Sequence, residues 1–134
     1  MNPQQATSIR FNAVVPQFTV PDVVKTAQYY RDVLGFVIEG YWDTPPVFGI
    51  VSRDYVDVFF NRATESEVRT GRAPGAYDAY FRVVGVDDLA AELRARGANI
   101  IDGPETRIYE QREVVVQDCN GLVLCFGEST SRPT

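Results

Sequence analysis

The chain contains no histidine among its 134 residues, and this absence removes several kinds of site at once. It excludes an imidazole general base, a histidine-paired nucleophile and an imidazole metal ligand. No apolar run approaches the ~20 residues that a membrane-spanning helix needs, and no basic segment followed by an apolar one opens the chain. We therefore expect no membrane partner and a cytoplasmic protein. In that compartment the two cysteines, Cys119 and Cys125, are expected to stay reduced.

Positive charge is also scarce, because 13 basic side chains stand against 18 acidic ones and give a net charge of −5. A nucleic-acid partner or an anionic membrane surface would call for a basic face, so neither is expected. The balance favours a neutral or cationic small molecule. The hydrophobic content of 45% is ample for a core, and the length predicts one domain or two modules that share a core.

The most informative stretch is 14–36, which reads as a strand, a capped helix and a glycine stop. Apolar and polar residues alternate over 14–20, which is the period of a strand. Asp22 then occupies the position of a helix N-cap. An apolar stripe at helical spacing follows, made of Val23, Ala27, Tyr30 and Leu34. Gly35 can adopt the left-handed conformation that ends the helix.

A second stretch repeats this plan. Residues 77–84 alternate like a strand, a helix over 87–96 begins at Asp87 or Asp88, and Gly97 ends it. Two copies of one unit predict a pair of pseudo-symmetric modules, and a solenoid would need more copies.

The pattern predicts an α+β fold of two β-α-β-β-β modules that form a curved mixed sheet with a concave cleft. The first module covers 10–61, the polar linker 62–76 and the second module 77–128. Expected strands in the first module are 11–20, 36–41, 47–51 and 55–61, around a helix at 23–34. Those of the second are 77–84, 98–101, 107–117 and 122–127, with turns at 52–54, 102–104 and 118–121.

These motifs resemble the vicinal oxygen chelate superfamily, which includes glyoxalase I, extradiol dioxygenases and bleomycin-resistance proteins. The resemblance rests on FTVPD at 18–22, YYRDVLGF at 29–36, AAELRARG at 90–97 and the DCNG turn at 118–121. It covers about residues 10–128. The family turn is usually Asp-Pro-Asp-Gly, so Cys119 and Asn120 depart from it. The resemblance implies the fold, but it is a weak guide to function because this fold hosts many chemistries.

In enzymes of that superfamily, a metal is held by one side chain from each of four strands. The resemblance implies that the corresponding positions here are Val15, Asp57, Asp78 and Cys125, with Val58 in place of Asp57 if the register slips by one. We prefer Asp57, because the packed face then holds the apolar residues on either side of it. Two carboxylates, one thiol and a hydrocarbon match neither a zinc nor a non-haem iron site. We therefore expect no metal and no cofactor, as in the bleomycin-binding members.

The expected ligand-binding residues share the face of the strands opposite the apolar set. They are Gln17, Asp57, Phe59, Asn61, Asp78, Tyr80, Arg82 and Cys125, with Trp42 and Tyr109 at the rim or at a dimer contact. Aromatic rings on that face can stack a planar ligand while polar groups orient it. The alternatives are an exposed sheet face, two solvated carboxylates and a buried, inert thiol at Cys125.

The leading functional hypothesis is a metal-free small-molecule binding protein resembling bleomycin-resistance-like sequestering proteins. Its ligand would be neutral or cationic and partly aromatic. The alternative is a lyase or isomerase of the same superfamily that uses Asp57 or Asp78 as a base. A structural or regulatory partner protein is a third class. We also expect a homodimer, since two such modules leave strand edges that a second copy can cover.

Overall fold

The computed structural model describes residues 8–64, 67 and 75–131, so most of the predicted linker at 62–76 lies outside the described residues. The first half of the chain forms β1 (Gln17–Val20), α2 (Val23–Asp32), β2 (Val37–Trp42), β3 (Phe48–Arg53) and β4 (Val56–Arg62). The second half forms β5 (Ala79–Arg82), α3 (Val86–Ala95), β6 (Asn99–Thr106), β7 (Gln111–Gln117) and β8 (Val123–Ser129). Each half is therefore a β-α-β-β-β module, and the predicted α+β fold is confirmed. Within the described residues, neither helix is long and apolar enough to cross a membrane.

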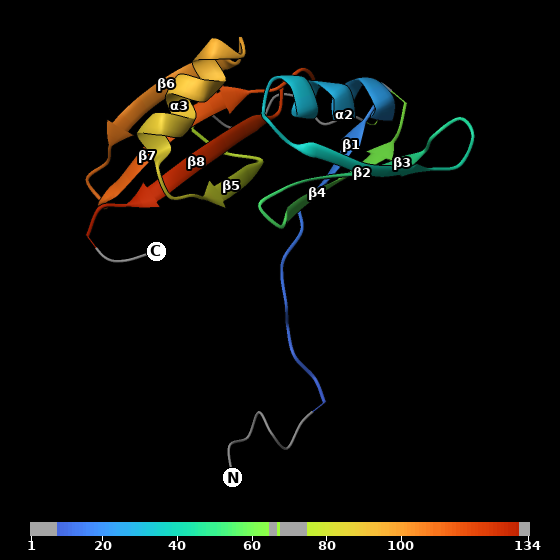
Figure 1. The fold of residues 1–134 in the computed structure, drawn as a ribbon, viewed down its shortest axis with the longest axis horizontal. Coiled ribbons are helices and arrows are strands. Elements are labelled where there is room, and N and C mark those ends of the chain that lie inside the picture. Colours follow the sequence, from blue (N-terminus) through green and yellow to red (C-terminus); the bar gives the residue numbers. More distant parts are fainter. Residues whose placement is uncertain (1–7, 65–66, 68–74, 132–134) are drawn as a thin grey trace.

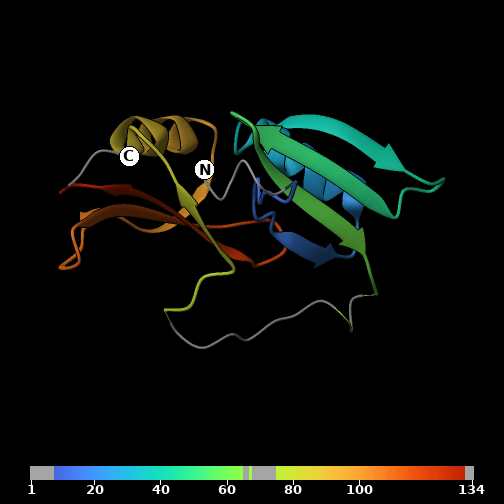
Figure 2. The same ribbon diagram turned by 90° about the horizontal axis from the view of Figure 1, so that it is seen from below.

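The curved sheet is divided into two four-stranded sheets, one per module, with strand orders β1-β4-β3-β2 and β5-β8-β7-β6. The first and last strands of each module run parallel, and the other neighbours run antiparallel. The two sheets lie side by side, with α2 and α3 on the same side of the molecule (Figure 1). The opposite faces carry no helix and are seen from below in Figure 2. We call them the open faces of sheet 1 (first module) and sheet 2 (second module).

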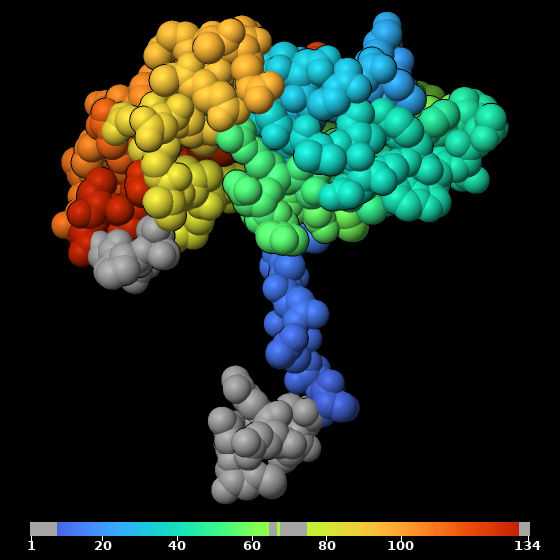
Figure 3. All heavy atoms as spheres, viewed as in Figure 1, coloured from blue at the N-terminus to red at the C-terminus, as the bar shows by residue number. Residues whose placement is uncertain are grey.

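The first module begins and caps its helix as the sequence predicts, but its first strand is shorter. Asp22 accepts a hydrogen bond from the Lys25 backbone N–H at 2.9 Å, which confirms the N-cap. The helix ends at Asp32 with Val33 as its C-cap, and Gly35 adopts φ +77° in the turn that follows. The strand predicted over 11–20 is wrong in extent, because only Gln17–Val20 pairs with β4. Residues 8–14 run away from the body of the molecule, and Phe11 is almost fully exposed (Figure 3).

The second module differs from prediction at its helix start and in β6. The N-cap of α3 is Gly85 and not Asp87 or Asp88, and the carboxylate of Glu128 accepts from the backbone N–H groups of Gly85 and Val86, both at 3.0 Å. The turn predicted at 102–104 is instead part of β6, where two register shifts bend the strand. Likewise, residues 52–53, predicted as part of a turn, end β3.

The two modules share a core through a ring contact, one buried hydrogen bond and one partly buried hydrogen bond. Tyr30 packs edge-on against Phe60 with ring centroids 4.9 Å apart, and Phe36 contacts Phe81 of the second module at 6.3 Å. The hydroxyl of Tyr30 donates to the buried Asp118 carboxylate at 2.7 Å. Asn120 donates to Thr26 at 3.0 Å. The 118–121 turn of one module is thereby anchored on the helix of the other.

Candidate functional site

The open face of sheet 1 carries a row of three aromatic rings, which we call the aromatic row: Trp42, Phe48 and Phe59. Trp42 lies opposite Phe48 in the β2–β3 register, and their ring centroids are 5.7 Å apart. The ring centroids of Phe48 and Phe59 are 5.3 Å apart. About half of Trp42 is exposed, and the two phenylalanines are half-buried. The row offers edge and face contacts to a planar ligand.

Predicted polar residues lie on the same face as the aromatic row. Asp57 and Asn61 flank Phe59 at alternate positions of β4, while Val58 and Phe60 are buried on the helix side. Asp57 lies opposite Ser52, whose hydroxyl donates a short hydrogen bond to Glu39. The structure therefore brings five predicted site residues onto one face: Gln17, Trp42, Asp57, Phe59 and Asn61.

The open face of sheet 2 is organised around Glu113 of β7, whose side chain is fully buried. Tyr80 of β5 donates to Glu113 Oε2 at 2.7 Å, and Tyr109 of the β6–β7 turn donates to Oε1 at 2.7 Å. The guanidinium of Arg107 donates to Oε1 from Nε at 3.1 Å. Tyr77 reaches the same oxygen at 3.5 Å. We call Tyr77, Tyr80 and Tyr109 the tyrosine cluster.

Tyr80 reaches Glu113 by crossing Gly127 of β8, which lies between the two strands. A Cβ at Gly127 would collide with the Tyr80 hydroxyl, so the absence of a side chain there is required for the hydrogen bond. Tyr80 lies opposite Cys125 in the β5–β8 register, and Gly127, two residues further along β8, lies opposite Glu113. The register therefore sets the path of the Tyr80 side chain over Gly127 to Glu113.

Burial and hydrogen bonding set the protonation of this network. Burial opposes the charged form of Glu113, but hydrogen bonds from Tyr109, Tyr80 and Arg107 outweigh it and lower the carboxyl pKa. Burial and donation to Glu113 raise the pKa of Tyr109 to about 12 and that of Tyr80 further. At neutral pH the carboxylate is therefore ionised, and both phenols keep their protons.

Cys125, predicted in the site, is buried beneath this face. Burial, and then the nearby Glu113 charge, raise the pKa of its thiol to about 12. A thiol that stays protonated is neither a good nucleophile nor a good metal ligand. This agrees with the inert thiol that the sequence analysis offered as an alternative.

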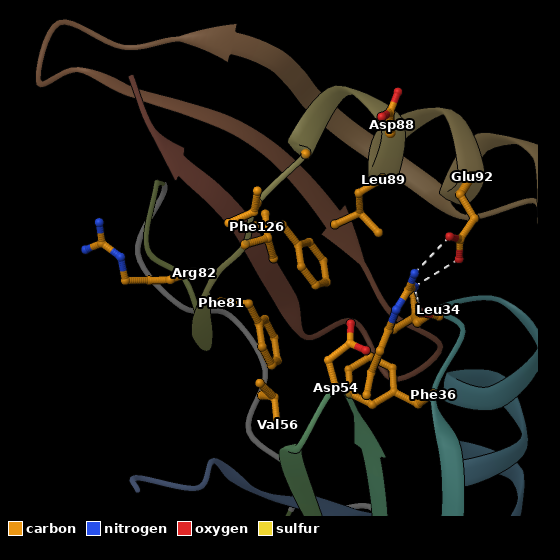
Figure 4. Close-up of a pocket in the computed structure, with 14 residues that line it drawn as sticks. Leu34, Phe36, Asp54, Val56, Phe81, Arg82, Asp88, Leu89, Glu92 and Phe126 are labelled. Carbon is orange, nitrogen blue, oxygen red and sulfur yellow. Dashed lines mark hydrogen bonds and ion pairs between the residues drawn. The ribbon is translucent and has the colours of Figure 1, made fainter. Parts of the chain in front are cut away.

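Gln17 and Asp78 line a small cavity of about 230 Å³ where the two modules meet. Asp78 accepts from the backbone N–H of Val123 at 2.8 Å, so one of its oxygens is committed to the strand. Arg82 is exposed at the end of β5 and lines a different concavity of about 520 Å³, with its guanidinium turned outward (Figure 4).

The residues at the implied metal positions do not fit a metal. Val15 offers no ligand atom, and Cys125 holds its proton. Among the described residues, no group of three or more acidic, cysteine or histidine side chains is placed to hold a metal ion.

The aromatic row and the tyrosine cluster do not meet within one chain. The aromatic row begins at Trp42, next to the β2–β3 turn, and the tyrosine cluster includes Tyr109 of the β6–β7 turn. These two turns lie at opposite ends of the molecule in both views (Figures 1 and 2). We call these two surfaces half-sites, because the sequence leaves open whether the expected concave cleft forms within one chain or across a dimer.

A larger concavity lies between the modules, with a volume of about 520 Å³. Its apolar lining includes Phe36, Phe81, Leu89 and Phe126, and Figure 4 shows these side chains from both modules. Its main polar groups are hydrogen-bonded to one another. The guanidinium of Arg53 binds both carboxylate oxygens of Glu92 at 2.9 and 2.8 Å and the Leu34 carbonyl at 2.9 Å.

Glu113 is not among the site residues predicted from the sequence, although the alternation of β7 carries a signal for it. It precedes the apolar run 114–116 in β7. Alternation around Val114 and Val116, which face α3, would have placed Glu113 on the open face as a charged residue inside a strand. Its partners come from β5 and from a turn, so no local sequence pattern predicts the hydrogen-bond network.

Comparisons with known proteins agree on the fold. A family model described as Glyoxalase/Bleomycin resistance protein/Dioxygenase superfamily matches residues 10–126. No curated protein matches in sequence. Among solved structures, a glyoxalase-related enzyme from Clostridium phytofermentans superposes with a TM-score of 0.74 at 18% identity, covering 91% of this chain and 98% of that one.

Two further structures carry names that state a ligand or a resistance. A bleomycin resistance determinant encoded on the transposon Tn5 gives a TM-score of 0.69 at 18% identity, over 89% of this chain and 98% of that one. The bleomycin-binding protein from Streptomyces verticillus, solved with copper(II)-bleomycin, gives a TM-score of 0.68 at 21% identity, over 92% of this chain and 99% of that one. At these identities the likeness establishes the fold alone.

Proposed function

This chain belongs to the glyoxalase/bleomycin resistance protein/dioxygenase superfamily, and from that premise we propose that it binds a small, partly aromatic molecule without changing it. The observation that carries the proposal is the state of the polar groups on the open faces. Glu113 is saturated with donors, and the Tyr80, Tyr109 and Cys125 protons are held tightly. Groups of this kind position a ligand, whereas a general acid or base needs a pKa near the working pH.

The aromatic row supports the same proposal from sheet 1. Its rings are partly exposed and stand beside the polar side chains of Asp57 and Asn61. That combination of apolar surface with a few polar groups is typical of small-molecule sites. The bleomycin-binding protein of the same fold offers a precedent for binding. We propose that this chain acts similarly and needs no metal, so elemental analysis of purified protein should find far less than one transition-metal ion per chain.

We further propose that the chain works as a homodimer, whose two-fold axis sets sheet 1 of one protomer against sheet 2 of its partner. The two half-sites lie at opposite ends of one chain, so a second copy is the direct way to join them. Exposed Phe11 and Val14 on the N-terminal segment offer apolar surface for the contact. Light scattering should give about twice 15.0 kDa, and a stable monomer would contradict this arrangement.

The test of the function is a thermal-shift screen against aromatic antibiotics and metabolites, because a ligand present at ~100 times its dissociation constant adds about 2.7 kcal/mol of stability. Each hit is then incubated with the protein and recovered. A sequestering protein returns it unchanged. Conversion to a product that depends on Asp57 or Asp78 would instead support the lyase or isomerase alternative.

A further inference from the structure

We propose that the tyrosine cluster is the subsite that selects the ligand's charge, and that it recognises a protonated amine. The inference rests on the proposed function and names the chemical group that the site would take. Three phenol rings surround a carboxylate that solvent does not reach, and the rings themselves are between 37% and 55% exposed. The charge is buried, while the surface that covers it remains open to a ligand.

The first argument is the direction of the hydrogen bonds. Each phenol has one O–H, and those of Tyr80 and Tyr109 are donated to Glu113 at 2.7 Å. Their oxygens can therefore only accept a further hydrogen bond. An ammonium group, which only donates, matches these acceptors. A carboxylate or phosphate would face oxygen lone pairs with no free proton between them.

The second argument is the arrangement of the rings. Tyr77 and Tyr80 have centroids 6.2 Å apart with planes inclined by 55°, so they form two walls and not a flat stack. Tyr109 closes on the same carboxylate from the β6–β7 turn. A cation placed over aromatic faces is attracted by their quadrupoles, most strongly where water is excluded.

The third argument is the balance of charge. Arg107 is the cation next to Glu113, but its guanidinium is also bound by Asp102 at 2.7 Å and Glu105 at 2.6 Å. One positive charge therefore faces three negative charges. The local field beneath the rings is negative, which favours a cationic ligand and opposes an anionic one.

The experiment uses three probes that differ in one group: 2-phenylethylamine, 2-phenylethanol and phenylacetate. Titration of the full-length protein at neutral pH, followed by two-dimensional NMR, gives an affinity and a location for each. We expect the amine to bind on the order of tenfold more tightly than the alcohol, and the acid to bind weakest. Shifts should centre on the three tyrosines and Gln111.

Two variants and a control separate recognition from folding. Glu113→Gln keeps the shape and removes the buried charge, and it should bring the affinities for amine and alcohol within about threefold of each other. Tyr109→Leu changes a half-exposed turn residue and is expected to fold. It therefore still tests the proposal if Glu113→Gln proves unstable. It should weaken the amine several-fold and the alcohol less than twofold. Glu110→Gln removes an exposed charge from the same turn and should leave the ratio unchanged.

Three outcomes overturn the inference. They are an alcohol that binds as tightly as the amine, an amine-to-alcohol ratio that Glu113→Gln and Tyr109→Leu leave unchanged, and no binding of the amine at millimolar concentration. The proposed function survives each of them if the screen still yields a ligand whose NMR shifts lie on the aromatic row. The proposed function itself fails if no small molecule in the screen binds at all.

Discussion

Replacing Tyr30 by phenylalanine should destabilise the protein, because the Tyr30 hydroxyl bonds the helix of one module to a buried carboxylate of the other. Tyr30 is fully buried and donates to Asp118 Oδ2 at 2.7 Å. The other oxygen of Asp118 accepts from the backbone N–H groups of Asn120 and Leu122 at 2.8 and 2.9 Å. The substitution thus leaves one carboxylate oxygen buried without a partner, while the ring packing is kept.

The expected loss is about 1.5–3 kcal/mol of unfolding free energy, the range for a hydrogen bond to a charged group. In a chain of this length that lowers the melting temperature by roughly 5–10 °C. Urea unfolding of wild type and Tyr30→Phe measures it. Tyr29→Phe is a matched control, since within the described residues the Tyr29 hydroxyl has no hydrogen-bond partner. A loss below about 0.5 kcal/mol, or one equal to that of Tyr29→Phe, would refute the reasoning.

The unfolding free energy lost in Tyr30→Phe should also depend on pH. Burial raises the pKa of Asp118, and the bonds from Tyr30 and two backbone groups counter that shift, so removing Tyr30 raises the pKa further. A folded-state pKa above the unfolded value costs stability as pH rises through it. The difference between Tyr30→Phe and wild type should therefore be larger at neutral pH than near pH 3, where the carboxyl is protonated in both states. A difference that is constant across this range would contradict the assignment.

Three further predictions concern the half-sites and the thiols. Gly127→Ala should push Tyr80 off its carboxylate and lower both stability and amine affinity, measurable by melting and titration. Cys119, which is exposed, should react with a thiol reagent at high pH before the buried Cys125 does, and mass spectrometry of protein denatured and alkylated without reductant should find both free. Asp57→Asn should weaken a cationic ligand by roughly 1–3 kcal/mol without changing fold stability; equal affinities would remove Asp57 from the site.

Local patterns predicted the modules well because their signals lie within a few residues of one another. The Asp22 cap and the Gly35 stop both belong to the helix they delimit, and the structure confirms them. The cap of α3 could not be found in this way. Its acceptor, Glu128, lies 43 residues from Gly85, and only the folded sheet brings the two together.

The candidate site was predicted in part for the same reason. Alternation along β4 correctly put Phe59 and Asn61 on the face opposite Val58. It gives no information on how the two modules are placed, and so it leaves open whether the cleft forms within one chain or across a dimer. The network on Glu113 depends on contacts such as that with Tyr80, 33 residues away, which no periodicity encodes.

The most direct test of the central claim is a mass balance on the bound ligand. The strongest hit of the screen is mixed with wild-type protein, held for many dissociation lifetimes, and extracted after denaturation. Chromatography and NMR then compare the extract with the starting compound, since both detect an isomer that mass alone would miss. The account predicts saturable binding and complete recovery of the unaltered compound. Accumulation of a product beyond the amount of protein present would contradict it and make the protein an enzyme.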